Sequence, residues 1–222
     1  MSDEDCERDL VRCRDRTAPG ALAALDQIRK RQKILDLEDE VERVQKELVS
    51  RQSAFRSHQK IEEFQRQFLP STYAVQARFR CLVLLGGTQQ GKTSKGMSLG
   101  GTSKTLKVSC GNCGPGVLPS LSAFDRHLHD AVLFDEVRPD QVLKNRELFQ
   151  SNQYVQTLGQ SPCNPYAYSI WVYHTAMILC ANSFNIESED LSEGDQKWLQ
   201  GNMMILNLPD GEKWYESKEE TI

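Results

Sequence analysis

The chain has 222 residues, of which 39% are hydrophobic and 26% charged, and its formal net charge is −4 at pH 7. This length is sufficient for one ordinary domain with an appendage, and no apolar run approaches the roughly 20 residues that a membrane span requires. The polar N-terminus MSDEDCERDL has the pattern of neither a signal peptide nor a transit peptide, and the seven irregularly spaced cysteines are typical of reduced thiols. These features predict a protein of the cytoplasm or the nucleus with no membrane partner.

The N-terminal part is predicted to be a disordered segment, residues 1–20, followed by a helical arm, residues 21–69. The arm contains neither glycine nor proline, and apolar residues recur in it at steps of three and four: Ile34, Leu37, Val41, Val44, Leu48 and Phe55. This pattern is typical of a coiled-coil seam and predicts pairing with a second copy. A long helix that packs back on its own domain is the alternative, because Arg51 and His58 also lie on the seam.

Residues 76–210 are predicted to form one α/β domain, and residues 211–222 a polar tail. Short apolar runs bounded by glycine and proline alternate with helical stretches such as DQVLKNRELFQSN and SEGDQKWLQGN. The predicted strands are residues 79–85, 105–109, 131–137, 175–182 and 203–208. Strands that alternate with helices predict a five-stranded parallel sheet with helices on both faces.

The first predicted strand leads into a P-loop, the phosphate-binding motif G-x-x-x-x-G-K-[ST]. Its residues are the candidate nucleotide ligands: Gly86, Gly87, Thr88, Gln89, Gln90, Gly91, Lys92 and Thr93. Glycines let backbone N–H groups approach phosphate oxygens, the N-terminus of the following helix favours negative charge, and the lysine reaches the β- and γ-phosphates. The Thr93 hydroxyl would complete the ligand shell of Mg²⁺. The motif therefore predicts ATP with Mg²⁺ as the ligand.

Two further strands end in polar residues that fit an ATPase. The run AVLFDEV places Asp135 where it would hold Mg²⁺ through water and Glu136 where it would orient or deprotonate the attacking water. The alternative is an acidic surface pair at the end of a strand. The run TAMILCAN ends in Asn182, in the position of the sensor that contacts the γ-phosphate and the attacking water in ATPases of the additional-strand type. Asparagine also ends strands for ordinary turn reasons.

The order of these three motifs resembles that of the superfamily 3 helicases. More closely, LHDAVLFDEVRP, ILCANSF and LSEGDQKWLQGNMMILNL are similar to the ATPase domain of replication initiators of small circular single-stranded DNA viruses, over about residues 79–208. This resemblance implies an AAA+-like five-stranded domain, assembly into a ring, and unwinding of DNA driven by ATP.

The chain departs from this family in three respects. The endonuclease domain of the viral proteins is replaced by the helical arm, since the strings HLH at 127–129 and YESK at 215–218 lie in the wrong places. No arginine follows Arg146, so Lys197 is the candidate substitute for the family's arginine finger, although it lacks the planar fork that suits phosphate. The segment that forms a DNA-gripping hairpin in the family has no Lys or Arg here but has aromatic residues that could stack on bases or fill a core: Tyr166, Tyr168, Trp171 and Tyr173.

The charge of the predicted catalytic half argues against strong binding of nucleic acid. Residues 81–222 contain 11 Lys and Arg against 16 Asp and Glu, a net charge of −5, whereas nucleic-acid binders usually have a basic face. We therefore expect weak binding of single-stranded DNA or RNA. The leading hypothesis is a Mg²⁺-dependent, ATP-hydrolysing homo-oligomer that assembles through the arm and the ATPase domain. The alternative is a coiled-coil interaction protein whose ATPase domain binds nucleotide without unwinding DNA.

Overall fold

The computed structural model describes residues 43, 55–56, 58–69, 76–100, 104–159, 167–209 and 211–215. The chain divides into two units, residues 1–48 and 49–222, and all of the described residues except Arg43 belong to the second. The predicted disordered N-terminus and nearly all of the predicted coiled-coil seam lie outside the described residues. Among the residues that are described, no helix is long and apolar enough to cross a membrane.

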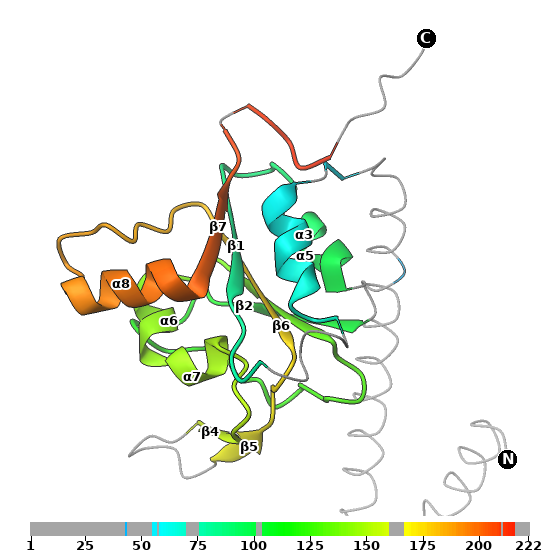
Figure 1. The fold of residues 1–222 in the computed structure, drawn as a ribbon, viewed down its shortest axis with the longest axis vertical. Coiled ribbons are helices and arrows are strands. Elements are labelled where there is room, and N and C mark those ends of the chain that lie inside the picture. Colours follow the sequence, from blue (N-terminus) through cyan, green and yellow to red (C-terminus); the bar gives the residue numbers. More distant parts are fainter. Residues whose placement is uncertain are drawn as a thin grey trace, which may run out of the picture. The chain divides into compact units, whose positions relative to one another are not determined.

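A five-stranded parallel sheet forms the centre of the second unit (Figure 1). Its strands are β1 (Cys81–Leu85), β2 (Thr105–Ser109), β3 (Ala131–Asp135), β6 (Ala176–Ala181) and β7 (Met203–Asn207), in the spatial order β2-β3-β6-β1-β7. Each strand lies within its predicted range. The strands β1, β3 and β6 are almost entirely buried, which explains their nearly continuous apolar sequences. The edge strand β2 instead alternates between buried and more exposed positions.

Helices cover both faces of this sheet, as predicted. Helix α3 (Gln59–Arg66) and helix α5 (Lys92–Gly100) lie on one side, and α6 (Pro139–Lys144), α7 (Arg146–Phe149) and α8 (Glu193–Asn202) lie on the other (Figure 1). Alternate strand residues supply two separate apolar cores. The first includes Leu82, Leu133 and Met97, and the second includes Val83, Phe134 and Leu199.

The end of the predicted arm differs from the prediction of one helix over residues 21–69. Phe55 is extended and forms an isolated antiparallel bridge with Tyr215. Helix α3 begins only at Gln59, and the side chain of His58 caps it by accepting a hydrogen bond from the backbone N–H of Lys60 at 3.1 Å. Ile61 and Phe64 of this helix are buried in the core. The last part of the arm therefore packs on its own domain, because burial of these apolar side chains there stabilises the fold.

A second, two-stranded antiparallel sheet lies between β3 and β6 in the sequence. It consists of β4 (Gln156–Leu158) and β5 (Tyr168–Ile170), with Thr157 opposite Ser169. Residues 160–166, which connect the two strands, lie outside the described residues. The pair lies toward the end of the parallel sheet where β3 and β6 begin, away from the end where β1 leads into the P-loop (Figure 1).

Candidate nucleotide-binding site

The spatial order of the strands brings the three predicted motifs to one edge of the sheet. The P-loop follows β1, Asp135 ends β3 and Asn182 follows β6, and these three strands are neighbours in the order β3-β6-β1. Because the strands are parallel, their carboxyl ends lie at the same edge, which is where ligands bind in α/β sheets. Residues that are far apart in the sequence therefore meet in a single site.

The P-loop has the backbone conformation that its glycines permit. Gly91 adopts a φ of 84°, in the left-handed region that favours glycine, and Gln89 adopts a φ of 61° without being glycine. Helix α5 starts immediately afterwards at Lys92, and its first hydrogen bond runs from the backbone N–H of Lys95 to the carbonyl of Gly91 at 2.9 Å. The N-terminus of α5 therefore lies at the loop, where backbone N–H groups of a first helical turn can bind phosphate.

Lys92 is the centre of the site. Its side chain is only 8% exposed, and its ammonium group donates hydrogen bonds to the carbonyls of Gly86 and Gly87 at 2.8 and 2.5 Å and to Oδ1 of Asn182 at 2.9 Å. Burial lowers the pKa of Lys92, and the nearby Cys180 and Asp135 oppose this effect. Phosphate oxygens are stronger acceptors than carbonyls because they carry charge. A bound phosphate can therefore replace these partners.

Thr93 and Asp135 form the predicted metal-binding pair. The Thr93 hydroxyl lies 3.2 Å from each carboxylate oxygen of Asp135. Both residues supply the hard oxygen ligands that Mg²⁺ prefers, and Mg²⁺ commonly takes only one or two protein ligands beside phosphates and water. Among the described residues no group of three or more His, Cys, Asp or Glu side chains is arranged to hold a metal ion. The pair thus fits an ion that is shared with a phosphate chain.

Lys107 is a member of the site that the sequence analysis missed. It lies on the edge strand β2, and its ammonium group is 3.1 Å from Oδ2 of Asp135. The parallel register between β2 and β3 places Ser109 beside Asp135, so Lys107 reaches the carboxylate from two residues earlier. A cation in the run TLKVS has no local signal of function. Only the pairing of β2 with β3 brings Lys107 to Asp135.

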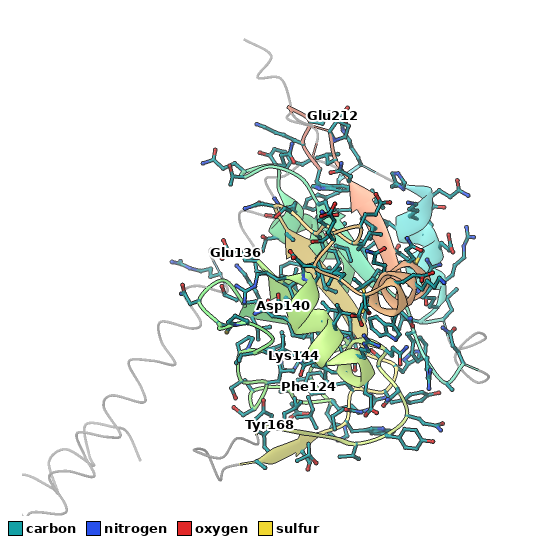
Figure 2. The ribbon with its side chains drawn as sticks, turned by 90° about the vertical axis from the view of Figure 1, so that its left-hand side faces the viewer. Phe124, Glu136, Asp140, Lys144, Tyr168 and Glu212 are labelled. Carbon is teal, nitrogen blue, oxygen red and sulfur yellow. The ribbon has the colours of Figure 1, made fainter. Side chains whose placement is uncertain are left out.

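Glu136 has an unusual backbone. Its φ is 60°, and its N–H donates a hydrogen bond to the carbonyl of Cys180 at 2.8 Å. A bulky residue in the left-handed region costs of order 1–3 kcal/mol, and such residues cluster at active sites. The side chain is exposed and lies against Gly111, in the loop after β2, so that a side chain added to this glycine would collide with the carboxylate. Figure 2 labels Glu136 above Asp140 and Lys144 of helix α6.

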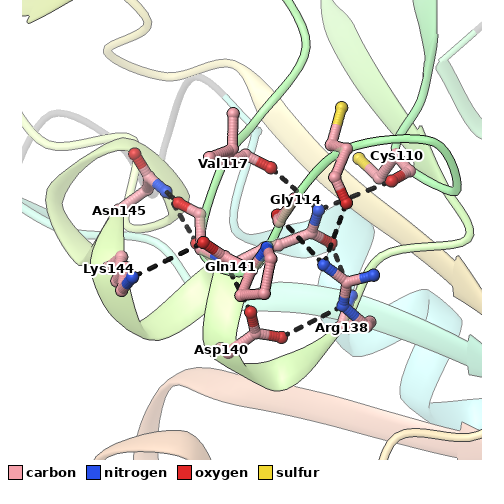
Figure 3. A network of polar contacts seen from close by, with 11 residues as sticks. Cys110, Gly114, Val117, Arg138, Asp140, Gln141, Lys144 and Asn145 are labelled. Atoms are coloured by element: carbon pink, nitrogen blue, oxygen red, sulfur yellow. Dashed lines mark hydrogen bonds and ion pairs between the residues drawn. The ribbon is translucent and has the colours of Figure 1, made fainter. Parts of the chain in front are cut away.

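The glycine-rich loop after β2 is held by helix α6 (Figure 3). The Arg138 guanidinium donates to the carbonyls of Cys113 and Gly114 at 3.1 and 3.0 Å, and Nε2 of the fully buried Gln141 donates to the carbonyl of Val117 at 2.8 Å. Burial raises the pKa of the Cys110 thiol at the start of this loop to about 12. The loop that borders Glu136 is therefore fixed in position, and Cys110 is an unreactive core thiol.

Lys197 is not brought to the other predicted site residues within this chain. It lies on helix α8 with 70% of its side chain exposed, and its ammonium group is 2.6 Å from Glu193, one helical turn away. An exposed ion pair of this kind contributes roughly 0.3–0.5 kcal/mol, so it holds Lys197 only weakly. Arg146, by contrast, pairs with Asp195 and lies over the ring of Trp198.

In the described part of the predicted polar tail, Gly211, Glu212 and Lys213 are exposed, but Trp214 packs against the domain. Trp214 is almost completely buried, with 1% of its surface exposed, and its backbone N–H donates to the carbonyl of Gln90 in the P-loop at 2.9 Å. The tail was predicted from its polar composition, and the burial of one tryptophan outweighs that composition. The WY dipeptide was the only local signal.

The aromatic residues near β5 contact their own fold. The Tyr168 hydroxyl accepts a hydrogen bond from the N–H of Leu121 at 2.7 Å, and the Tyr173 hydroxyl donates to the carbonyl of Gln76 at 3.1 Å. Trp171 remains 44% exposed, with the Arg126 guanidinium 4.4 Å from the centre of its ring. Both tyrosines therefore contribute hydrogen bonds within the fold. Tyr166 lies outside the described residues.

Comparison with known proteins gives only a distant similarity. No family model matches the sequence, and no curated protein matches it. Among solved structures, the S. cerevisiae Hsp104–ADP complex is similar with a TM-score of 0.38 and 14% sequence identity, over 67% of this chain and 32% of that chain. The chain thus spans about a third of the length of the protein that it matches.

Proposed function

We propose that this chain binds ATP with Mg²⁺ through the P-loop and hydrolyses it. The observation that carries the proposal is the pair of contacts that joins three strands, Lys92 with Asn182 at 2.9 Å and Thr93 with Asp135 at 3.2 Å. A structural glycine turn would need neither a buried lysine nor a hydroxyl aimed at a carboxylate. We also infer a fold of the AAA+ type, because β6 lies between β1 and β3, as in ATPases of the additional-strand type.

Each residue then has a distinct role. Lys92 exchanges its carbonyl acceptors for oxygens of the β- and γ-phosphates, while the N–H groups of the first turn of α5 bind the phosphate chain. Thr93 and Asp135 would hold Mg²⁺ with their hydroxyl and carboxylate oxygens. Glu136 orients the attacking water or accepts its proton, and Asn182 hydrogen-bonds both the γ-phosphate and that water. Bound Mg²⁺ supplies charge stabilisation for the transferred phosphoryl group.

Hydrolysis is tested by changing Glu136 to Gln, with Glu147→Gln as the matched control. Glu147 is also an exposed glutamate, but it lies on α7. Loss of a general base typically lowers a rate by about 10²–10⁴-fold, so Glu136→Gln should lower steady-state ATP hydrolysis to this extent and leave calorimetric binding of Mg²⁺–ATP unchanged. Glu147→Gln should behave like the wild type. Equal hydrolysis by the wild type and Glu136→Gln rules out the assigned role.

The second candidate function is an interaction protein that uses the nucleotide as a structural or switching ligand. Two observations favour it: Lys197 is paired with Glu193 on its own helix, and the segment around β4 and β5, residues 147–196, contains no Lys or Arg. A wild type that binds Mg²⁺–ATP in the calorimeter and releases no phosphate would establish this function in place of the first.

We also propose that the chain forms homo-oligomers through the arm and the ATPase domain, with Lys197 reaching the site of a neighbouring copy. Charges buried on a paired seam are costly, so Val41→Lys with Leu48→Lys should give a smaller species in light scattering. Gln32→Lys with Ser50→Lys adds the same charge off the seam and should leave the mass unchanged. An unchanged mass in the seam variant would contradict pairing through the arm.

A further inference from the structure

The segment that follows β7, residues 208, 209 and 211–215, crosses the P-loop, and we call it the strap. The N–H of Leu208 donates to the carbonyl of Leu85 at 3.0 Å, which continues the pairing of β7 with β1. The strap then contacts Gln90 twice: Nε2 of Gln90 donates to the carbonyl of Pro209 at 3.0 Å, and the N–H of Trp214 donates to the Gln90 carbonyl at 2.9 Å. In Figure 1 the red strap arches over the end of β1.

The other side of the strap is held by the residues that precede helix α3. Phe55 forms a β-bridge with Tyr215, and the N–H of Arg56 donates to the carbonyl of Trp214 at 3.0 Å. The Arg56 side chain also forms an ion pair with Glu212 at 2.6 Å. The strap is thus fixed on both sides at the carboxyl end of the sheet, where Figure 2 labels Glu212.

The ring of Tyr215 lies directly against the P-loop. A Cβ atom added to Gly91 would be 2.7 Å from Cδ1 of this ring, so only glycine permits the approach. Tyr215 is half-buried, and the ammonium group of the exposed Lys213 lies 5.4 Å from the ring centre. An exposed cation–π contact is weak, and an aromatic base can displace it. The strap therefore presents an aromatic ring beside the phosphate-binding loop.

The direction of a bound nucleotide follows from the side chains around the loop. Asp135 and Asn182 mark the γ-phosphate end. Asp135 ends β3 and Asn182 follows β6, and both strands lie on one side of β1. Strand β7 and the strap lie on the opposite side of β1. A nucleotide whose terminal phosphate faces Asn182 therefore extends its nucleoside toward Tyr215.

We propose that Tyr215 is the platform on which the base of the bound nucleotide stacks, and that the bridge to Phe55 holds the platform in place. This inference rests on the proposed binding of nucleotide by the P-loop. It assigns a role to Tyr215 and Phe55, which do not take part in the proposed binding of phosphate. It also accounts for the burial of Trp214, which anchors the strap next to Gln90.

The test compares ATP with ribose 5′-triphosphate, which has the same phosphate chain without a base. Calorimetry with Mg²⁺ gives both affinities for the wild type, Tyr215→Ala, Tyr215→Phe and the control Tyr154→Ala, which changes a tyrosine that is 65% exposed on another part of the surface. Stacking predicts that Tyr215→Ala binds ATP about tenfold more weakly, with an unchanged affinity for ribose 5′-triphosphate. Tyr215→Phe and Tyr154→Ala should match the wild type, and circular dichroism verifies that each variant is folded.

The outcomes separate this inference from the proposal on which it rests. If the wild type binds both triphosphates and Tyr215→Ala binds ATP equally well, the stacking role is wrong and nucleotide binding stands. Tighter binding of ATP by Tyr215→Ala would show that the ring obstructs the site, and this also overturns stacking. If the wild type binds neither triphosphate, the proposed function fails and the inference fails with it. If Tyr215→Ala does not fold, a Tyr215→Phe variant that loses affinity for ATP but not for ribose 5′-triphosphate also contradicts ring stacking.

Discussion

The two ends of the five-stranded sheet use their polar side chains differently. At the carboxyl end, Lys92 contacts Asn182 and Thr93 contacts Asp135, and the two pairs bring together residues that follow or end three strands. At the amino end, the Tyr168 hydroxyl accepts a hydrogen bond from the backbone N–H of Leu121. Figure 2 labels Tyr168 at this end, below Glu136. The partners of Lys92 can be exchanged for phosphate oxygens, which are stronger acceptors because they carry charge. The Tyr168 hydroxyl instead satisfies the backbone N–H of the buried Leu121, which would lose its partner if the tyrosine turned away.

The volume of a cavity does not identify the end of the sheet that binds a ligand. A cavity of about 820 Å³ lies at the amino end, lined in part by Arg126, His129 and Trp171. Its Arg126 is already engaged with the Trp171 ring and with the carbonyl of Tyr173. The convergence of a buried lysine, a hydroxyl and a carboxylate is the better guide, because it specifies a chemistry as well as a space.

The largest difference between the two ends of the sheet is expected in ATP turnover, when Asn182→Ala is compared with Trp171→Ala. Loss of one group that stabilises a transition state typically costs about 10²–10³-fold in rate, so Asn182→Ala should lower ATP turnover to this extent. Trp171→Ala should leave turnover unchanged, since it lies at the other end of the sheet. Steady-state phosphate release by both variants, at saturating ATP, measures the difference.

The same assay in the presence of single-stranded DNA tests whether the amino end of the sheet, which includes Trp171, binds nucleic acid. Residues 81–222 have a net charge of −5, and phosphate contacts dominate the affinity of DNA-binding proteins. We therefore expect single strands to leave the turnover of the wild type and of Trp171→Ala unchanged. Submicromolar binding that accelerates turnover about tenfold would restore a full helicase function for the chain.

A change of pH is expected to have a smaller effect, on the affinity for Mg²⁺–ATP. Burial lowers the pKa of Lys92, and binding of phosphate needs its ammonium form. Affinity for Mg²⁺–ATP should therefore fall as the pH rises through this lowered pKa, before the ordinary lysine value of about 10.4 is reached. The stability of the free protein should change in the opposite sense over the same window, because burial penalises only the charged form.

Calorimetric titrations between about pH 7 and pH 10 measure this dependence. The fall in affinity should be present in the wild type and absent from the weak residual binding of Lys92→Ala. Identical pH profiles for the two proteins would show that Lys92 does not titrate in the binding reaction.

The sequence was sufficient to predict the five strands and the residues at their carboxyl ends. Continuous apolar runs fix buried strands, and the P-loop, Asp135 and Asn182 each end such a run. The strand order could not be read from local pattern, and it alone places Lys107 beside Asp135.

Contacts between distant segments also escaped prediction. Phe55 fitted a helical seam, but its pairing with Tyr215 is a tertiary contact that overrides the local period. Trp214 stands in a polar stretch and is buried against the P-loop segment for the same reason. Arg126 precedes Trp171 by a long interval, so its position over that ring has no local signal.

The central claim, that the carboxyl end of the sheet binds Mg²⁺–ATP, is tested most directly by calorimetric binding to the wild type, Lys92→Ala and Lys104→Ala. Lys104 is an exposed lysine, paired with Asp130 at 3.1 Å. A hydrogen bond to a charged group contributes about 1.5–3 kcal/mol, so Lys92→Ala should bind roughly 10–150-fold more weakly. Lys104→Ala should bind as the wild type does. Equal affinities for the wild type and Lys92→Ala would contradict the account.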